Sequence, residues 1–261
     1  MRVLVTFALD AEFAPWRGLR KFLSVDYDGL QLFRSKAGDT HLTVLLTGVG
    51  KESSAKAMGL MMAMADDDKY FDVCISSGLA GALCDTLTVG EVIAPQSLIA
   101  ESRRADVAMD ELKVDEELHQ RALAAGARNA DCLFTADRMF VKASQKSACA
   151  LRAQLVDMES FEIVKEAVAW GARSLVVRAV SDTAKEDLPI DFSLTLSGKQ
   201  QISLRKVVWQ LSKNPLALPA LMRFGKQSRL AAERLAKFLD GYVQSIGRVV
   251  GEKRSKEVAA S

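Results

Sequence analysis

The segment from residue 156 to residue 182 constrains the fold of this 261-residue chain more than any other. After a short polar start it predicts a helix, Phe161–Trp170, and then an apolar run, Ser174–Val180, bounded by turn residues. An apolar run of this kind predicts a buried strand, and α/β proteins place their chemistry beyond the ends of such strands. Glu159 stands just before the helix and Asp182 just after the strand, so one helix–strand unit can bring two carboxyl groups together.

Strands alternate with helices along most of the chain, which predicts an α/β fold with a central sheet covered on both faces. Elsewhere we predict a glycine turn at residues 78–83, a loop at 101–115 and a frayed end at 251–261. The other predicted strands are Arg2–Ala8, Leu30–Arg34, Leu42–Leu46, Asp72–Ser77, Cys132–Thr135 and one or two within 89–100; the other predicted helices are Ser53–Ala65, Glu116–Ala125, Ser144–Leu151, Ser203–Ser212 and Ala217–Tyr242.

Charge is unevenly distributed along the chain. The formal net charge is +2, but the part from Lys199 onward has thirteen Lys and Arg against four Asp and Glu, whereas the part before it has 22 against 29. A basic tail on an acidic body suggests contact with something anionic, such as a membrane surface, a partner or a substrate. A solvated helical face is the alternative.

Several classes of protein are disfavoured by the remaining composition. His41 and His119 are too few and too isolated for a zinc site, and we expect no metal or cofactor. The apolar start, Met1–Leu9, is halted by acidic residues and predicts a first strand rather than a signal peptide. No apolar run reaches membrane-spanning length, so we expect a cytoplasmic protein. The four cysteines lack a CxxC spacing and fit a reducing compartment: Cys74, Cys84, Cys132 and Cys149.

Two glycine-containing stretches are ambiguous as motifs. Residues 47–51 (TGVGK) lack the first glycine and the hydroxyl residue of a P-loop, and they lack the GxGxxG of a dinucleotide site. The loop can still offer backbone N–H groups to a ligand, or be a simple turn. Residues 78–81 (GLAG) follow a strand and allow close approach of a ligand or close packing.

In combination the motifs resemble the nucleoside phosphorylase superfamily, in its 5′-methylthioadenosine/S-adenosylhomocysteine nucleosidase branch. The resemblance covers about residues 1–182. It implies a three-layer α/β/α fold with a central mixed, twisted sheet, and a homodimer that needs no cofactor. The matching stretches are 8–12 (ALDAE), 47–51 (TGVGK), 77–83 (SGLAGAL), 89–90 (VG), 156–160 (VDMES) and 177–182 (VRAVSD).

The resemblance also implies a role for each matching residue. Asp182, oriented by Ser181, would protonate or hydrogen-bond purine N7, which requires an acid form accessible near neutral pH in a dry pocket. Glu159 would bind the ribose hydroxyls, and Glu12 would act as general base on water. Met158 would pack beneath the sugar, Phe140 would stack on the purine, and the remaining pocket positions would be Val49, Val141 and Leu79. Leu79 stands where nucleosidases commonly carry a small hydroxyl residue, and the stretch 137–141 is one residue longer than the usual pattern.

The C-terminal part is expected to form a separate unit. We predict a catalytic domain over residues 1–197 and a basic helical extension over 198–261. Residues 214–229 are similar to the tail of hopanoid-associated phosphorylases, which implies a lipid-linked adenosyl substrate and peripheral membrane contact. A helix that packs on the body or on a second subunit is the alternative.

The nucleophile decides the reaction. Phosphorylases of the bacterial purine type carry a Gly-Asp-Pro-x-Arg loop after the first strand, whereas this chain has Glu12, which would repel phosphate. Hydrolysis of a purine (adenine) nucleoside is therefore the first prediction. Phosphorolysis is the alternative, since Arg17, Arg138 and Arg178 could supply cations. A non-catalytic nucleoside-binding protein is the third hypothesis.

Overall fold

The computed structural model describes residues 1–27, 29–63, 71–102, 107–189 and 218–259. In the described residues, the strands are β1 Arg2–Phe7, β2 Leu23–Tyr27, β3 Leu30–Ala37, β4 Thr40–Leu46, β5 Val73–Ala82, β6 Val92–Glu101, β7 Met109–Lys113, β8 Arg128–Thr135, β9 Leu155–Asp157 and β10 Arg173–Asp182. They form one mixed sheet in the order β10-β6-β8-β9-β5-β1-β4-β3-β2, with β7 paired to β6.

One part of this sheet closes on itself. β10 pairs in parallel with β5 over most of its length and antiparallel with β6, while β8 and β9 complete the circuit back to β5. The long register of β5 with β10 runs from Val73 opposite Arg173 to Gly81 opposite Asp182. The carboxyl ends of β5 and β10 therefore meet at one place, beside the short strand β9.

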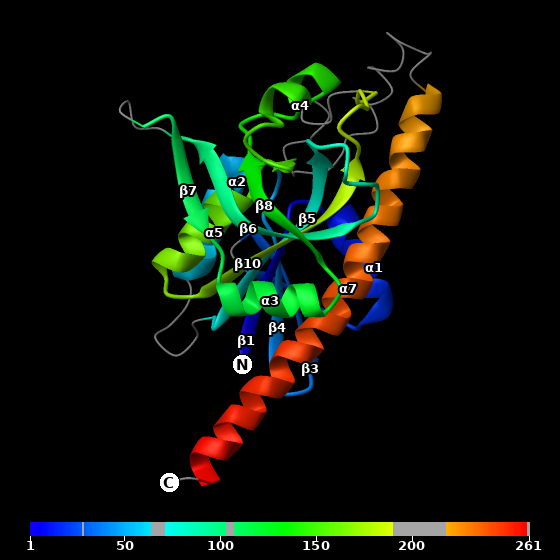
Figure 1. The fold of residues 1–261 in the computed structure, drawn as a ribbon. Helices are drawn as coiled ribbons and strands as arrows, with labels where there is room; N and C mark the ends of the chain where they lie inside the picture. Colours follow the sequence, from blue (N-terminus) through cyan, green and yellow to red (C-terminus); the bar gives the residue numbers. More distant parts are fainter. Residues whose placement is uncertain (28, 64–70, 103–106, 190–217, 260–261) are drawn as a thin grey trace.

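Helices cover both faces of the sheet, as predicted (Figure 1). They are α1 Asp10–Leu19, α2 Lys51–Ala63, α3 Glu116–Ala124, α4 Ala143–Cys149, α5 Ser160–Ala169 and α7 Leu218–Ala259. Side chains alternate across a strand, so Val3 and Val5 of β1 pack in the cluster that holds α1, α3 and α7. Leu4 points to the opposite cluster, with α2 and α5. The α/β class with a central mixed sheet and a C-terminal helix is confirmed.

Helix α7 is a structural part of the body (Figure 1). Its Leu239 and Tyr242 are fully buried, and the Tyr242 hydroxyl donates to the Leu118 carbonyl at 2.8 Å. The indole N–H of Trp16 donates to Asp240 at 3.0 Å. None of the helices in the described part of the chain has the length and apolarity to span a bilayer. The predicted boundary at 197/198 and the predicted helix Ser203–Ser212 lie outside the described residues.

Three local predictions were wrong, and one strand was missed. The glycine turn at 78–83 is mostly strand, because β5 continues through Ala82 beside β10. Residues 109–113, expected as loop, form β7 against β6, and β2 was not predicted. Helix α7 runs to Ala259, where a frayed end was expected. Strands such as β2 and β7 depend on pairing with a neighbour more than on local propensity.

Candidate functional site

A cavity of about 500 Å³ opens at the meeting point of β5, β9 and β10. Helix α1, the segment before α4, and α7 complete its walls. It is lined by eight of the nine predicted site residues: Glu12, Val49, Leu79, Phe140, Met158, Glu159, Ser181 and Asp182. Val141 does not line the cavity. Its carbonyl accepts a hydrogen bond from the Leu188 N–H at 2.8 Å, which joins the segment before α4 to the segment after β10.

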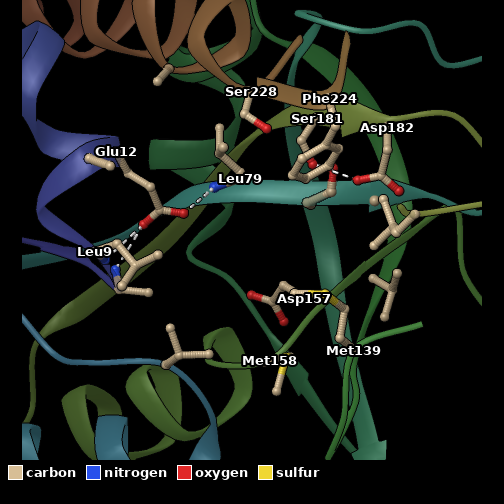
Figure 2. Close-up of a pocket in the computed structure, with 18 of the residues that line it drawn as sticks. Leu9, Glu12, Leu79, Met139, Asp157, Met158, Ser181, Asp182, Phe224 and Ser228 are labelled. Atoms are coloured by element: carbon tan, nitrogen blue, oxygen red, sulfur yellow. Dashed lines mark hydrogen bonds between the residues drawn. The ribbon is translucent and has the colours of Figure 1, made fainter. Parts of the chain in front are cut away.

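Glu12 is held in the cavity by main-chain N–H groups (Figure 2). One carboxyl oxygen accepts from Ala8 at 3.0 Å and Leu9 at 3.1 Å, and the other accepts from Leu79 at 3.2 Å. Burial raises the pKa of Glu12, and nearby Arg178 and these hydrogen bonds oppose the rise. A fixed carboxyl group with a raised pKa is suited to accept a proton.

Gly78 makes room for charged side chains. Its φ is +145°, and a Cβ there would lie 2.2 Å from Arg178 Nη1 and 3.3 Å from both carboxyl oxygens of Glu12. A side chain at this position would therefore displace Arg178 or Glu12. The sequence predicted a close approach at this glycine, and the groups that approach are these two side chains.

Glu159 sits directly before α5 and faces the glycine loop. Its Oε1 accepts from the Gly50 N–H at 2.8 Å, and Gly50 adopts a φ of +91°, which favours glycine. Burial, then the charge of Asp157, raises the pKa of Glu159 to about 8, although Arg178 and Gly50 act in the opposite direction. The loop therefore directs this N–H to a protein carboxyl group.

A buried ion pair that the sequence did not predict lies behind these acids. Arg178 Nη2 is 2.6 Å from Asp157 Oδ2, and both side chains are essentially inaccessible to water. Asp157 also accepts from the Thr135 hydroxyl at 2.7 Å and the Ser160 N–H at 3.0 Å. A signal was available, because an arginine within an apolar strand requires a partner.

Asp182 ends β10 and has a partner on each oxygen. The Ser181 hydroxyl donates to Oδ1 at 2.6 Å (Figure 2), and the Lys146 ammonium donates to Oδ2 at 2.5 Å. Ser181 was predicted to orient Asp182, and its hydrogen bond suits that role. Lys146 was not predicted, because a lysine in a short polar helix gives no sequence signal of burial.

Helix α7 forms the wall of the cavity opposite Met158 (Figure 2). Apolar side chains from α1 and from the segment after β10, Pro15 and Leu188, continue this wall. The described residues hold no group of three or more His, Cys, Asp or Glu side chains suited to a metal ion. The α7 residues in the wall are Leu221, Phe224, Gly225, Ser228, Arg229 and Ala232.

Known proteins resemble this chain in sequence and in fold. The 5′-methylthioadenosine/S-adenosylhomocysteine nucleosidase of Shewanella halifaxensis is 24% identical over 196 residues, covering 63% of this chain and 78% of the relative. The enzyme of the same name from Glaesserella parasuis is 23% identical over 186 residues, with 63% and 77% covered.

Two solved structures from Helicobacter pylori share the fold. Its 5′-methylthioadenosine/S-adenosylhomocysteine nucleosidase superposes with a TM-score of 0.72 at 17% identity, covering 94% of this chain and 98% of its own. Its futalosine hydrolase, as a mutant, gives 0.71 at 16% identity, covering 94% and 99%. The family model of the phosphorylase superfamily matches residues 10–244, from the start of α1 into α7. The chain is therefore a member of the phosphorylase superfamily.

Proposed function

We propose that this protein hydrolyses the N-glycosidic bond of a purine nucleoside and releases adenine. The observation that carries the proposal is the meeting of Glu12, Glu159 and Asp182 around one cavity, although 170 positions separate the first from the last. Its relatives named as 5′-methylthioadenosine/S-adenosylhomocysteine nucleosidases support the same chemistry.

At the base, Asp182 protonates purine N7 and makes adenine a better leaving group. The hydrogen bond from Ser181 supports this assignment, since it fixes the carboxyl plane. Phe140, which lines the cavity with its ring centroid 6.1 Å from that of Phe134, stacks on the purine. Val141, next to Phe140, contributes to the base pocket indirectly: its carbonyl binds the N–H of Leu188, which lines the cavity.

At the sugar, Glu159 binds the ribose hydroxyls and Met158 packs beneath the ring, with Val49 and Leu79 on either side. Bond cleavage develops positive charge on the ribose, and buried carboxyl groups stabilise that charge. Glu12 takes a proton from the water that attacks the anomeric carbon. Its position among three N–H donors supports this role, because these fix the carboxyl group without neutralising it.

The test is release of free adenine from methylthioadenosine, adenosylhomocysteine and adenosine, with and without phosphate. Release that needs no phosphate is the expected result. Strict dependence on phosphate would instead establish phosphorolysis, and binding without release would indicate a non-catalytic nucleoside-binding protein.

Phosphorolysis of a lipid-linked adenosyl substrate is the second candidate. Arg138 lines the cavity and supplies a cation for phosphate, whereas Arg178 is buried in its ion pair with Asp157. The apolar α7 wall suits a large apolar group on the 5′ side. A phosphate requirement, together with turnover of a lipid-linked but not a methylthio substrate, would favour this candidate over hydrolysis.

The proposal extends to assembly and surroundings. We expect a homodimer in the cytoplasm, with a basic C-terminal part that can contact an anionic membrane surface. Exposed Leu218 and Met222 beside Arg223 on α7 support the membrane contact. Light scattering and co-sedimentation with anionic vesicles test the two expectations.

A further inference from the structure

Lys146 is a buried cation that the proposed reaction does not yet use. It lies on α4 and is 1% exposed. Its ammonium group donates to Asp182 Oδ2 at 2.5 Å, to the Thr183 carbonyl at 2.7 Å and to the Glu186 carbonyl at 3.0 Å. An ammonium group has three N–H donors, so all three are occupied. Lys146 therefore acts through Asp182 and the chain that follows it, rather than by binding a substrate.

The ion pair between Lys146 and Asp182 is buried, and burying two charges costs free energy. Its side chains are 1% and 6% exposed. Buried ion pairs often contribute less stability than apolar side chains of the same volume, because both charges lose their hydration. Stability alone is thus a weak reason for Lys146, and its position against the end of β10 points to Asp182.

We propose that Lys146 is a positioning residue that holds the Asp182 carboxyl group toward the purine and stabilises the carboxylate left after proton transfer. The inference rests on the proposed function. In the step, a proton moves from Asp182 to N7 and the electrons of the C1′–N9 bond move to the purine. The water oxygen bonds to C1′, and its proton moves to Glu12. Asp182 then carries a full negative charge next to the Lys146 ammonium.

Other charged groups near this pair already have partners. Glu186, whose carbonyl binds Lys146, directs its carboxylate to Arg223 on α7 at 2.8 Å. Asp187 pairs with Lys142, which stands one residue before α4, at 2.9 Å. The remaining charged side chains that line the same cavity are Glu12, Arg138, Asp157, Glu159 and Arg229.

Lys142 provides a matched control, because it anchors the same chain segment but does not touch Asp182. We expect Lys146→Met to lower kcat about 10²-fold with little change in KM, and Lys142→Met to lower it less than twofold. Equal losses of kcat in the two variants, or a loss that appears in KM rather than in kcat, would overturn the proposal.

A double-mutant cycle keeps the test valid if Lys146→Met does not fold. Asp182→Asn/Lys146→Met has no unpaired buried charge and should fold. If Lys146 acts through Asp182, adding Lys146→Met to Asp182→Asn should change kcat less than threefold. A further loss near 10²-fold in that background would show an independent role and refute the inference.

A binding measurement separates this inference from the proposed function. A C-nucleoside analogue of adenosine that carries a hydrogen on N7 cannot be cleaved, and it requires a carboxylate acceptor. We expect the wild type and Lys142→Met to bind it at pH 7 at least tenfold more tightly than Lys146→Met, because Lys146 holds the Asp182 carboxyl group toward N7. Equal binding at pH 7 would refute the role of Lys146 even if adenine is released, whereas the expected gap without adenine release from any substrate would refute only the proposed function.

Discussion

The two ends of the cavity differ in their balance of charge. At the end proposed to hold the sugar, the buried carboxyl groups of Asp157 and Glu159 and the partly buried one of Glu12 lie near one buried cation, Arg178. At the base end a single carboxyl group, Asp182, is matched by a single ammonium group, Lys146. The excess of acids favours positive charge on a sugar, while the matched pair favours a carboxyl group that gives up a proton and is stabilised afterwards. In the proposed reaction, carboxyl groups therefore serve two purposes according to their neighbours.

The largest expected effect comes from breaking the base end. Asp182→Asn should lower kcat for adenine release about 10³-fold, because an amide cannot donate a proton to N7. The fold should survive, since the amide oxygen can accept from Lys146 while its NH₂ faces the Ser181 hydroxyl, which can accept. Thermal unfolding measured beside the kinetics checks this. A loss of less than tenfold would remove Asp182 from the acid role.

A smaller effect, and one that depends on the nucleophile, is expected at the sugar end. Glu12→Gln should lower kcat about 10²-fold if water attacks, because no base then accepts its proton. The amide oxygen can keep the bonds from Ala8 and Leu9, at the cost of the one from Leu79. The measurement is the rate of adenine release with and without phosphate. If Glu12→Gln is as active as the wild type when phosphate is present, hydrolysis is contradicted.

The charge excess at the sugar end should also appear as a pH-dependent cost in stability. Burial raises the pKa of Glu159 to about 8 in the folded protein, above the ordinary glutamate value of 4.5, so the folded state holds a proton that the unfolded state has lost between these values. The free energy of unfolding should therefore fall as pH rises from about 4.5 to 8, and the full cost remains above pH 8.

Glu159→Gln should relieve this cost and keep the bond from Gly50 through its amide oxygen. We expect it to raise the melting temperature at pH 9 by several degrees and to change it little at pH 5. Scanning calorimetry at the two pH values makes the comparison. A melting temperature that shifts equally at both would mean that Glu159 is not the titrating group.

Much of this site was within reach of the sequence. The apolar runs in the sequence predict the alternation of strands and helices. The acidic residues Glu12, Glu159 and Asp182 lie at or just after the ends of strands β1, β9 and β10. Eight of the nine site residues implied by the family resemblance line the cavity. Val141 does not line the cavity, because side chains beside a pocket point into or away from it according to local backbone geometry.

Local chemistry along the chain determined the α/β class, the covering of both faces and the acids at the strand ends, because periodicity and turn residues act over a few positions. Only the tertiary structure decided that β5 runs through its glycines, that Gly78 admits Arg178 and Glu12, and that α7 walls the cavity. It also decided that Lys146 meets Asp182 across 36 positions. Buried charges take their partners from distant segments, and no local pattern encodes which segments those are.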